Sequence, residues 1–181
     1  MNDSTHWIRT RQSRALIGAA LAMSLALGAA FVAVNDPPPD APAQHGAALS
    51  DAQAAAQVVD AAREIVATAG LREATGGYTF MSCSTGDEPP YQAALYMSFA
   101  VPQATSAQYL DGVASAMAAD GWAVSAVVGE HFGHKLTLGG VISDISRNPE
   151  KPGFATMRLY GECRNIADHR DDNPAWTDVS L

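Results

Sequence analysis

Residues 91–101, YQAALYMSFAV, decide the fold of this 181-residue chain. Large apolar side chains recur at every second position, at Leu95, Met97, Phe99 and Val101. The side chains on the alternate positions include Gln92, Tyr96 and Ser98. Because successive side chains of a strand point to opposite faces, this alternation predicts an antiparallel strand with one face in the core and one in water.

Two amphipathic helices are predicted on either side of this strand. The first begins after Ser50, a good N-cap residue, and ends at Gly70. Its apolar face holds Val58, Ala62, Ile65 and Val66. The second begins at Thr105 or Ser106 and ends at Gly121, and its apolar stripe holds Leu110, Val113, Ala114 and Met117. Each apolar face requires a sheet or another helix beneath it.

The remaining segments with strand composition are separated by glycine and proline turns. They are residues 78–84, 122–128, 135–138, 141–146 and 154–163. We expect turns at Gly76-Gly77 and at Gly139-Gly140, the second of which closes a hairpin. The order of helix, two strands, helix and four strands predicts an α+β domain. Its largely antiparallel sheet of about six strands is covered on one face by the two helices.

The N-terminal part of the chain has the composition of a membrane anchor. Three arginines precede residues 15–34, which contain no charged side chain and would span about 30 Å as a helix. The basic flank predicts that the N-terminus is cytoplasmic and that the rest of the chain lies outside. Cleavage after Ala30, with Gly28 two residues before it, is the alternative. We expect a retained, single-pass transmembrane helix in the cell membrane.

The chain is therefore predicted to have five parts. They are a basic cytoplasmic N-terminus (1–14), a transmembrane anchor (15–34), a proline-rich linker (35–49), an extracytoplasmic α+β domain (50–164) and a mostly disordered polar tail (165–181). The formal net charge of −8 disfavours binding to nucleic acid, which is held mainly by basic contacts to phosphate.

Cys83 and Cys163 are the only cysteines in the sequence. Because exported proteins form and keep disulfides, we expect the two to be bonded. The loop of about 80 residues that the bond would close corresponds to about 4.5 kcal/mol in the chain-entropy model. Neither cysteine lies near the end of the apolar run, so the sequence offers no cysteine there for lipid attachment.

Several segments resemble the mycobacterial LppJ-like lipoproteins. They are residues 51–66, 80–91 (FMSCSTGDEPPY), 134–138 and 161–165 (GECRN), together with Asp168 and His169. The resemblance covers nearly all of residues 50–169. It implies a small envelope-anchored protein of unknown activity and does not imply a reaction. The family name also implies a lipid-modified cysteine at the end of the leader, where this chain is apolar, so a protein anchor would replace the lipid.

Polar side chains in the turns lack the spacing that catalysis or metal binding requires. Three groups of polar side chains have residue types found in active or metal sites: Glu130, His131 and His134; Asp168, His169, Asp171 and Asp172; and Ser82, Ser84 and Thr85 beside Cys83. The first has too few ligands for structural zinc, and the second lacks the glycine turn and final glutamate of a calcium loop. The third matches no nucleophile motif. We expect no catalytic residue, no metal and no cofactor.

A rigid turn is the most promising surface feature of the sequence. Pro89 and Pro90 restrict the backbone and would present Asp87, Glu88 and Tyr91 to a partner at low entropic cost. A purely structural connection between two strands is the other explanation. With the anchor and the spacer, the turn favours a non-enzymatic accessory module that binds an unidentified envelope protein.

The alternative function is binding of a lipid or small molecule in an apolar cavity between helices and sheet. Such a cavity would be lined by Phe80, Met97, Phe99 and Met117, and nearby aromatic rings that could contribute are Tyr78, Tyr91, Tyr96 and Trp122. Trp122 directly follows a predicted helix, a position that favours the core.

Overall fold

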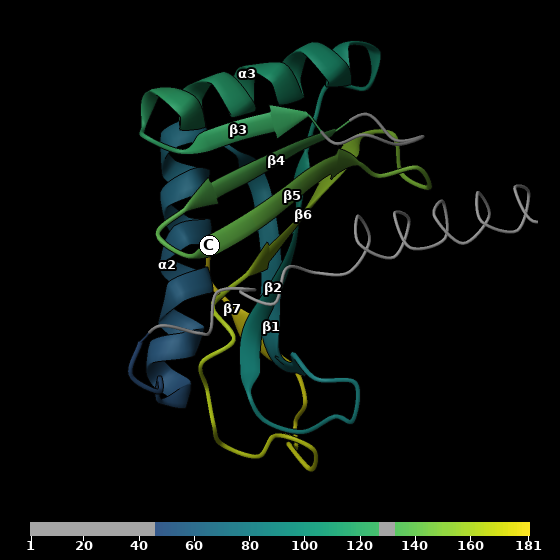
Figure 1. Ribbon diagram of the computed structural model, residues 1–181. Helices are drawn as coiled ribbons and strands as arrows, with labels where there is room; N and C mark the ends of the chain where they lie inside the picture. Colours follow the sequence, from purple (N-terminus) through teal and green to yellow (C-terminus); the bar gives the residue numbers. More distant parts are fainter. Residues whose placement is uncertain (1–45, 127–132) are drawn as a thin grey trace, which may run out of the picture. The chain divides into compact units, whose positions relative to one another are not determined.

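The computed structural model describes residues 46–126 and 133–181 (Figure 1). Its elements are α2 (Asp51–Ala69), β1 (Arg72–Ser82), β2 (Tyr91–Ala100), η2 (Gln103–Thr105), α3 (Ser106–Ala119), β3 (Ala123–Ala126), β4 (Gly133–Leu138), β5 (Val141–Arg147), β6 (Phe154–Tyr160) and β7 (Thr177–Val179). The predicted cytoplasmic segment 1–14, the anchor 15–34 and linker residues 35–45 lie outside the described residues. Across the two described ranges, no helix has both the length and the apolar character to span a bilayer.

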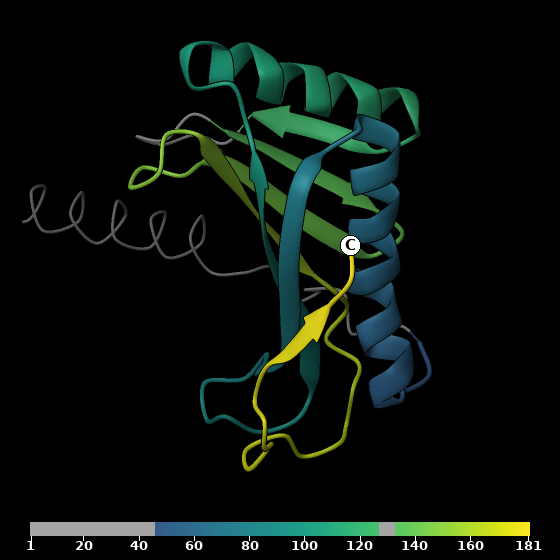
Figure 2. The same cartoon turned by 180° about the vertical axis from the view of Figure 1, so that it is seen from behind.

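The strands form one antiparallel sheet in the order β3-β4-β5-β6-β2-β1-β7. Helices α2 and α3 pack on the same face, as the front and back views show (Figures 1 and 2). This confirms the predicted α+β class, with two helices on one face of an antiparallel sheet. The sheet has seven strands instead of about six, because β7 comes from the segment predicted to be a tail.

The decisive strand has the burial that its sequence predicts. Leu95, Met97 and Phe99 of β2 are buried against the helices, whereas Tyr96 points to the opposite face and is 38% exposed. Helix α2 begins with a capping box in which Gln53 N–H donates to Ser50 Oγ at 3.3 Å and Ser50 N–H donates to Gln53 Oε1 at 2.9 Å. The predicted apolar stripe of α3 is buried as well.

Gly76 and Gly77 do not form the predicted turn but lie inside β1. A Cβ at Gly76 would come within 2.5 Å of the Tyr96 carbonyl oxygen, and one at Gly77 within 2.5 Å of the Thr177 carbonyl oxygen. The two glycines therefore permit close approach of neighbouring strands. The Gly139-Gly140 turn is confirmed, since both residues have positive φ, at 56° and 85°.

Residues 161–181 form a strap around one end of the sheet, which corrects the prediction of a mostly disordered tail. Asn165 exchanges backbone hydrogen bonds with Tyr91, at 2.7 and 3.1 Å. Further along the strap, β7 pairs with Gly76–Tyr78 of β1, and Val179 and Leu181 pack against the core (Figure 2). Polar composition suggested disorder, but these few apolar anchors and the sheet edge order the segment.

Candidate functional site

The face of the sheet opposite the helices is the leading candidate for a binding surface. In the antiparallel register, Tyr96 of β2 lies beside Arg158 of β6, and Ala94 lies beside Tyr160. Tyr96 and Arg158 are exposed and Tyr160 is half-buried. This open face thus combines aromatic rings with a cation.

Two neighbouring hollows lie on the open face, and we call them together the open-face groove. The first, of about 290 Å³, is lined by Thr79, Met81, Ala94, Leu95, Tyr96, Arg158, Tyr160 and Trp176. The second, of about 550 Å³, is lined by residues of β1, β2 and the strap, again with Tyr96 and Trp176. Because both hollows share these two rings, Tyr96 and Trp176 form their common wall.

Trp176 is held in a defined position on the open face. A Cβ at Gly77 would lie 2.6 Å from the indole ring, so the ring covers the bare backbone of that glycine. The indole N–H donates to Asp178 Oδ1 at 2.9 Å. The residue is nevertheless 41% exposed. A large apolar side chain held in place and partly open to solvent is suited to anchoring a ligand.

Arg158 is the charged residue of the first hollow. Asp144 of β5 is its cross-strand neighbour in register, but the two side chains form no ion pair within 4 Å. Among residues 46–126 and 133–181, the Arg158 guanidinium has no ion-pair partner. Its planar donors are therefore available to a ligand carboxylate.

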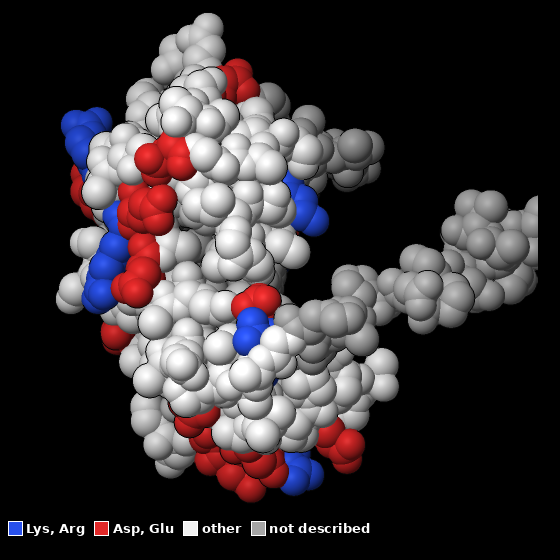
Figure 3. Space-filling model, turned by 60° about the vertical axis from the view of Figure 1, so that its left-hand side comes forward, with Lys and Arg blue, Asp and Glu red and all other residues white. Residues whose placement is uncertain are grey.

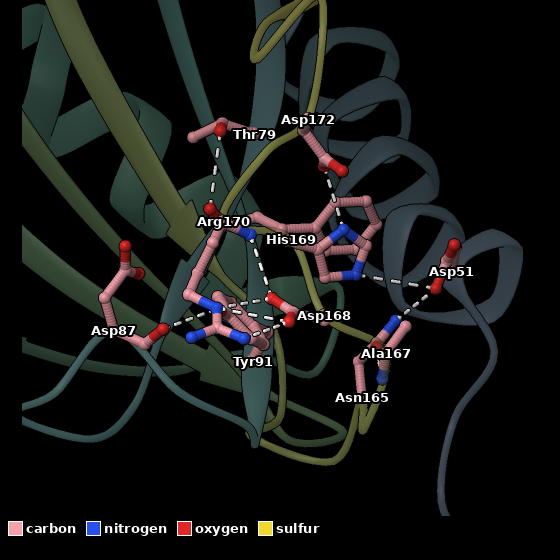
Figure 4. Close-up of polar contacts among 11 residues, drawn as sticks. Asp51, Thr79, Asp87, Tyr91, Asn165, Ala167, Asp168, His169, Arg170 and Asp172 are labelled. Carbon is pink, nitrogen blue, oxygen red and sulfur yellow. Dashed lines mark hydrogen bonds and ion pairs between the residues drawn. The ribbon is translucent and has the colours of Figure 1, made fainter.

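A second cluster, centred on His169, lies where the strap meets β1 and the start of α2 (Figure 4). The imidazole stacks on Phe80, with ring centroids 3.8 Å apart, and meets the Tyr91 ring edge-on at 5.1 Å. Its Nδ1 lies 2.8 Å from Asp172 Oδ2, and its Nε2 lies 3.5 Å from Asp51 Oδ1. The side chain is 5% exposed. This burial makes His169 a packing residue that joins the strap to β1 and to α2.

Asn165 extends this cluster with a buried polar link. Its Nδ2 donates to Asp51 Oδ1 at 2.8 Å, and its Oδ1 accepts from Ala167 N–H at 2.7 Å (Figure 4). Asp51 lies in the first turn of α2, where a carboxylate is favourable beside the helix N-terminus. Asp51, Phe80, Tyr91, Asn165 and His169 lie in segments that carry the family resemblance, and they meet in one place that fastens the strap.

Asp168 and Arg170 form an exposed pair next to this cluster. The Arg170 side chain and backbone N–H donate to the Asp168 carboxylate and lower its pKa from 3.8 to about 2. Asp172 is paired with His169, so Asp168 and Asp172, two of the three carboxylates in the segment that lacks a calcium-loop pattern, pair with strap residues. In the part of the chain that the structure describes, no three metal-ligating side chains converge.

The structure buries Tyr91, one of the residues of the predicted docking turn. Tyr91 is 1% exposed, and its hydroxyl donates to the Asp87 carbonyl oxygen at 2.7 Å. Burial, and secondarily Asp87, raises the pKa of this phenol. Tyr91 thus packs inward, whereas Asp87, Glu88 and Pro89 are exposed. Acidic side chains gather at this end of the domain, where the turn and the strap lie (Figure 3).

The serines of the turn have structural partners. Ser82 Oγ and Ser84 Oγ both donate to the Glu88 carbonyl oxygen, at 2.6 and 3.1 Å. The predicted disulfide between Cys83 and Cys163 is confirmed, with Cα atoms 6.0 Å apart. It ties the turn that follows β1 to the start of the strap. These hydroxyls and this bond give the turn its shape.

Of the predicted histidine group, only His134 falls within the described residues. Its Nε2 lies 2.9 Å from Asp111 Oδ1, which connects β4 to α3. Glu130 and His131 lie outside the described residues.

The side chains predicted to line a cavity between helices and sheet belong mainly to the core. Met97, Phe99 and Met117 are completely buried in one cluster of apolar side chains, and Phe80 stacks on His169. Trp122 is buried, as expected from the sequence.

Most residues of the open-face groove were not predicted from the sequence, and among them are Met81, Arg158 and Trp176. The available signal was Trp176, a large apolar residue in an otherwise polar segment. Without knowledge of β7, that signal could not be assigned to the sheet.

Comparison with known proteins gives consistent matches over the domain. Residues 50–181 match the family model described as "Putative lipoprotein LppJ". A protein of that name from Mycobacterium tuberculosis (strain CDC 1551 / Oshkosh) is 36% identical over 181 aligned residues, covering 96% of this chain and 94% of the relative. Another from Mycobacterium bovis is 39% identical over 127 residues, covering 69% and 66%. No solved structure matches the chain significantly.

Proposed function

The chain belongs to the LppJ lipoprotein family, and on that premise we propose that it is an envelope protein that binds another protein through its open-face groove. The domain acts outside the cytoplasm and performs no catalytic step. In support, the buried side chains of His169 and Tyr91 contact other side chains and a carbonyl oxygen of the domain itself.

Membrane attachment in this proposal is through residues 15–34. The relatives are named lipoproteins, but both cysteines of this chain are bonded to each other. An uncharged apolar run behind three arginines would replace the lipid. Intact-mass measurement tests this, because the proposal requires a mature protein that retains residues 15–34. A mature N-terminus between Ala30 and Asp36 would contradict it.

The open-face groove is the observation that carries the binding proposal. A monomeric domain rarely leaves several large apolar side chains together on a surface without a use for them. Here Met81, Tyr96 and Trp176 are each about 40% exposed around a cation that has no ion-pair partner in the described ranges. The turn that follows β1 exposes Asp87 and Glu88. Its contact with the partner protein, in addition to the groove, stays a prediction.

Site-specific crosslinking in living mycobacterial cells tests the function. A photoreactive amino acid at Tyr96 should give a discrete protein adduct, whereas the same group at the exposed Glu64 of α2 should not. The adduct should disappear in Trp176→Ala. Equal crosslinking from Tyr96 and Glu64, or none from Tyr96, would reject the groove as the binding surface.

A further inference from the structure

We propose that the open-face groove holds a proline-rich segment of the partner protein, with one acidic residue paired to Arg158. This inference rests on the proposed function and specifies the chemistry of its partner.

Over β2 and β6, the sheet face offers the partner side chains and no backbone pairing. Strands β2 and β6 each have a hydrogen-bonded neighbour on both sides, so their backbone groups are used within the sheet. A ligand on this face therefore leaves its own backbone N–H groups without sheet partners, and burying such groups is costly. Proline has no backbone N–H, so a proline-rich segment avoids much of this cost.

The shape of the groove also suits an extended proline helix. Two hollows share a wall made of Tyr96 and Trp176. In a polyproline II helix, residues three apart project to the same side, about 9 Å from one another. In the proposed complex, proline rings on one side of such a helix contact Tyr96 and Trp176 and enter the hollows beside them, as in other aromatic-lined grooves that bind such helices.

Arg158 favours a single acidic residue in the bound segment over several. Its guanidinium has no ion-pair partner within the described residues and lies among Tyr96, Tyr160 and Trp176. A planar guanidinium pairs well with a carboxylate. The protein as a whole carries a net charge of −8, so further acidic residues in the ligand would be repelled.

Peptide binding to the full chain, purified in detergent with its disulfide intact, tests this chemistry. The probe is a capped polyproline nonapeptide with a central aspartate. One control peptide has a central lysine, and the other keeps the aspartate but has alanine in place of proline. We expect the probe to bind about tenfold more tightly than either control, which is the effect of one well-placed anchor.

Two variants test separately the roles of Trp176 and Arg158 in peptide binding. Trp176→Ala should weaken probe binding about tenfold. Arg158→Gln should remove the preference for aspartate over lysine and keep the preference for proline over alanine. Lys135→Gln is the matched control, because Lys135 is exposed on the same face but does not line the groove. It should bind as the unchanged protein does.

Equal binding of the three peptides, or unchanged preferences in Arg158→Gln, would overturn this inference. If Tyr96 still crosslinks a protein in cells in that case, the groove remains the binding surface and only the partner's chemistry is wrong. Binding of a chitin oligosaccharide in the groove, with none of the peptides bound, would also overturn it, because the ligand would then be a glycan.

Discussion

The two faces of the sheet differ in how they bury the side chains of the same strand. On the helix face, Leu95, Met97 and Phe99 of β2 are buried in a closed core. On the open face, Tyr96 lies between two of these residues and borders a groove with Arg158 and Trp176. Period-two alternation thus places buried core side chains and exposed groove side chains within a few residues of one another, so substitutions on opposite faces should have different effects.

The largest contrast is expected between Phe99 and Tyr96. Phe99→Ala removes a fully buried ring and should lower the free energy of unfolding by about 4 kcal/mol. Tyr96→Ala removes a ring that is more than one third exposed and should cost about 1 kcal/mol or less. Urea unfolding of both variants measures the difference. Similar losses would mean that the open face is part of the stabilising core.

The disulfide should have the next largest effect. Replacing Cys83 and Cys163 together by serine should destabilise the domain by about 3 kcal/mol, since the bond restricts a long loop in the unfolded chain. The loss should appear as a shift of the urea midpoint, with crosslinking from Tyr96 preserved under native conditions. A shift below about 0.5 kcal/mol would show that the bond contributes little to folding.

The His169 cluster should contribute less to the free energy of unfolding than the disulfide does, but more than an exposed side chain. His169→Ala removes the stack on Phe80 and the edge contact with Tyr91, and should cost about 2 kcal/mol. Asp171→Ala, an exposed change on the same strap, serves as the control and should cost less than about 0.5 kcal/mol. Equal unfolding midpoints for the two variants would show that the His169 cluster does not fasten the strap.

The smallest effect is expected from Asp168, and it depends on pH. Folding lowers the pKa of this carboxyl from 3.8 to about 2, so its contribution is present above pH 3.8 and is lost as the pH falls towards 2. Asp168→Asn should therefore be slightly destabilising at pH 6, and its difference from the unchanged protein should be much smaller at pH 2. Urea midpoints at the two pH values test this. A larger difference at pH 2 than at pH 6 would contradict the assigned direction.

Much of the domain was predictable from local sequence, because local rules govern it. The alternation in residues 91–101, the cap at Ser50 and the Gly139-Gly140 turn all act over a few residues. The disulfide followed from compartment and cysteine count. The predicted turn at Gly76 and Gly77 is wrong because glycine is required there by close contacts with β2 and with the strap, both distant in sequence.

The sequence by itself determined the fold class, the faces of the two helices and of β2, the cysteine pair and the family. Tertiary structure alone decided that a polar segment becomes the strap, that Tyr91 turns inward, and that Tyr96, Arg158 and Trp176 share a groove. The physical reason is distance along the chain. Periodicity and capping are properties of neighbouring residues, whereas a groove requires strands that are far apart in sequence to lie side by side in the sheet.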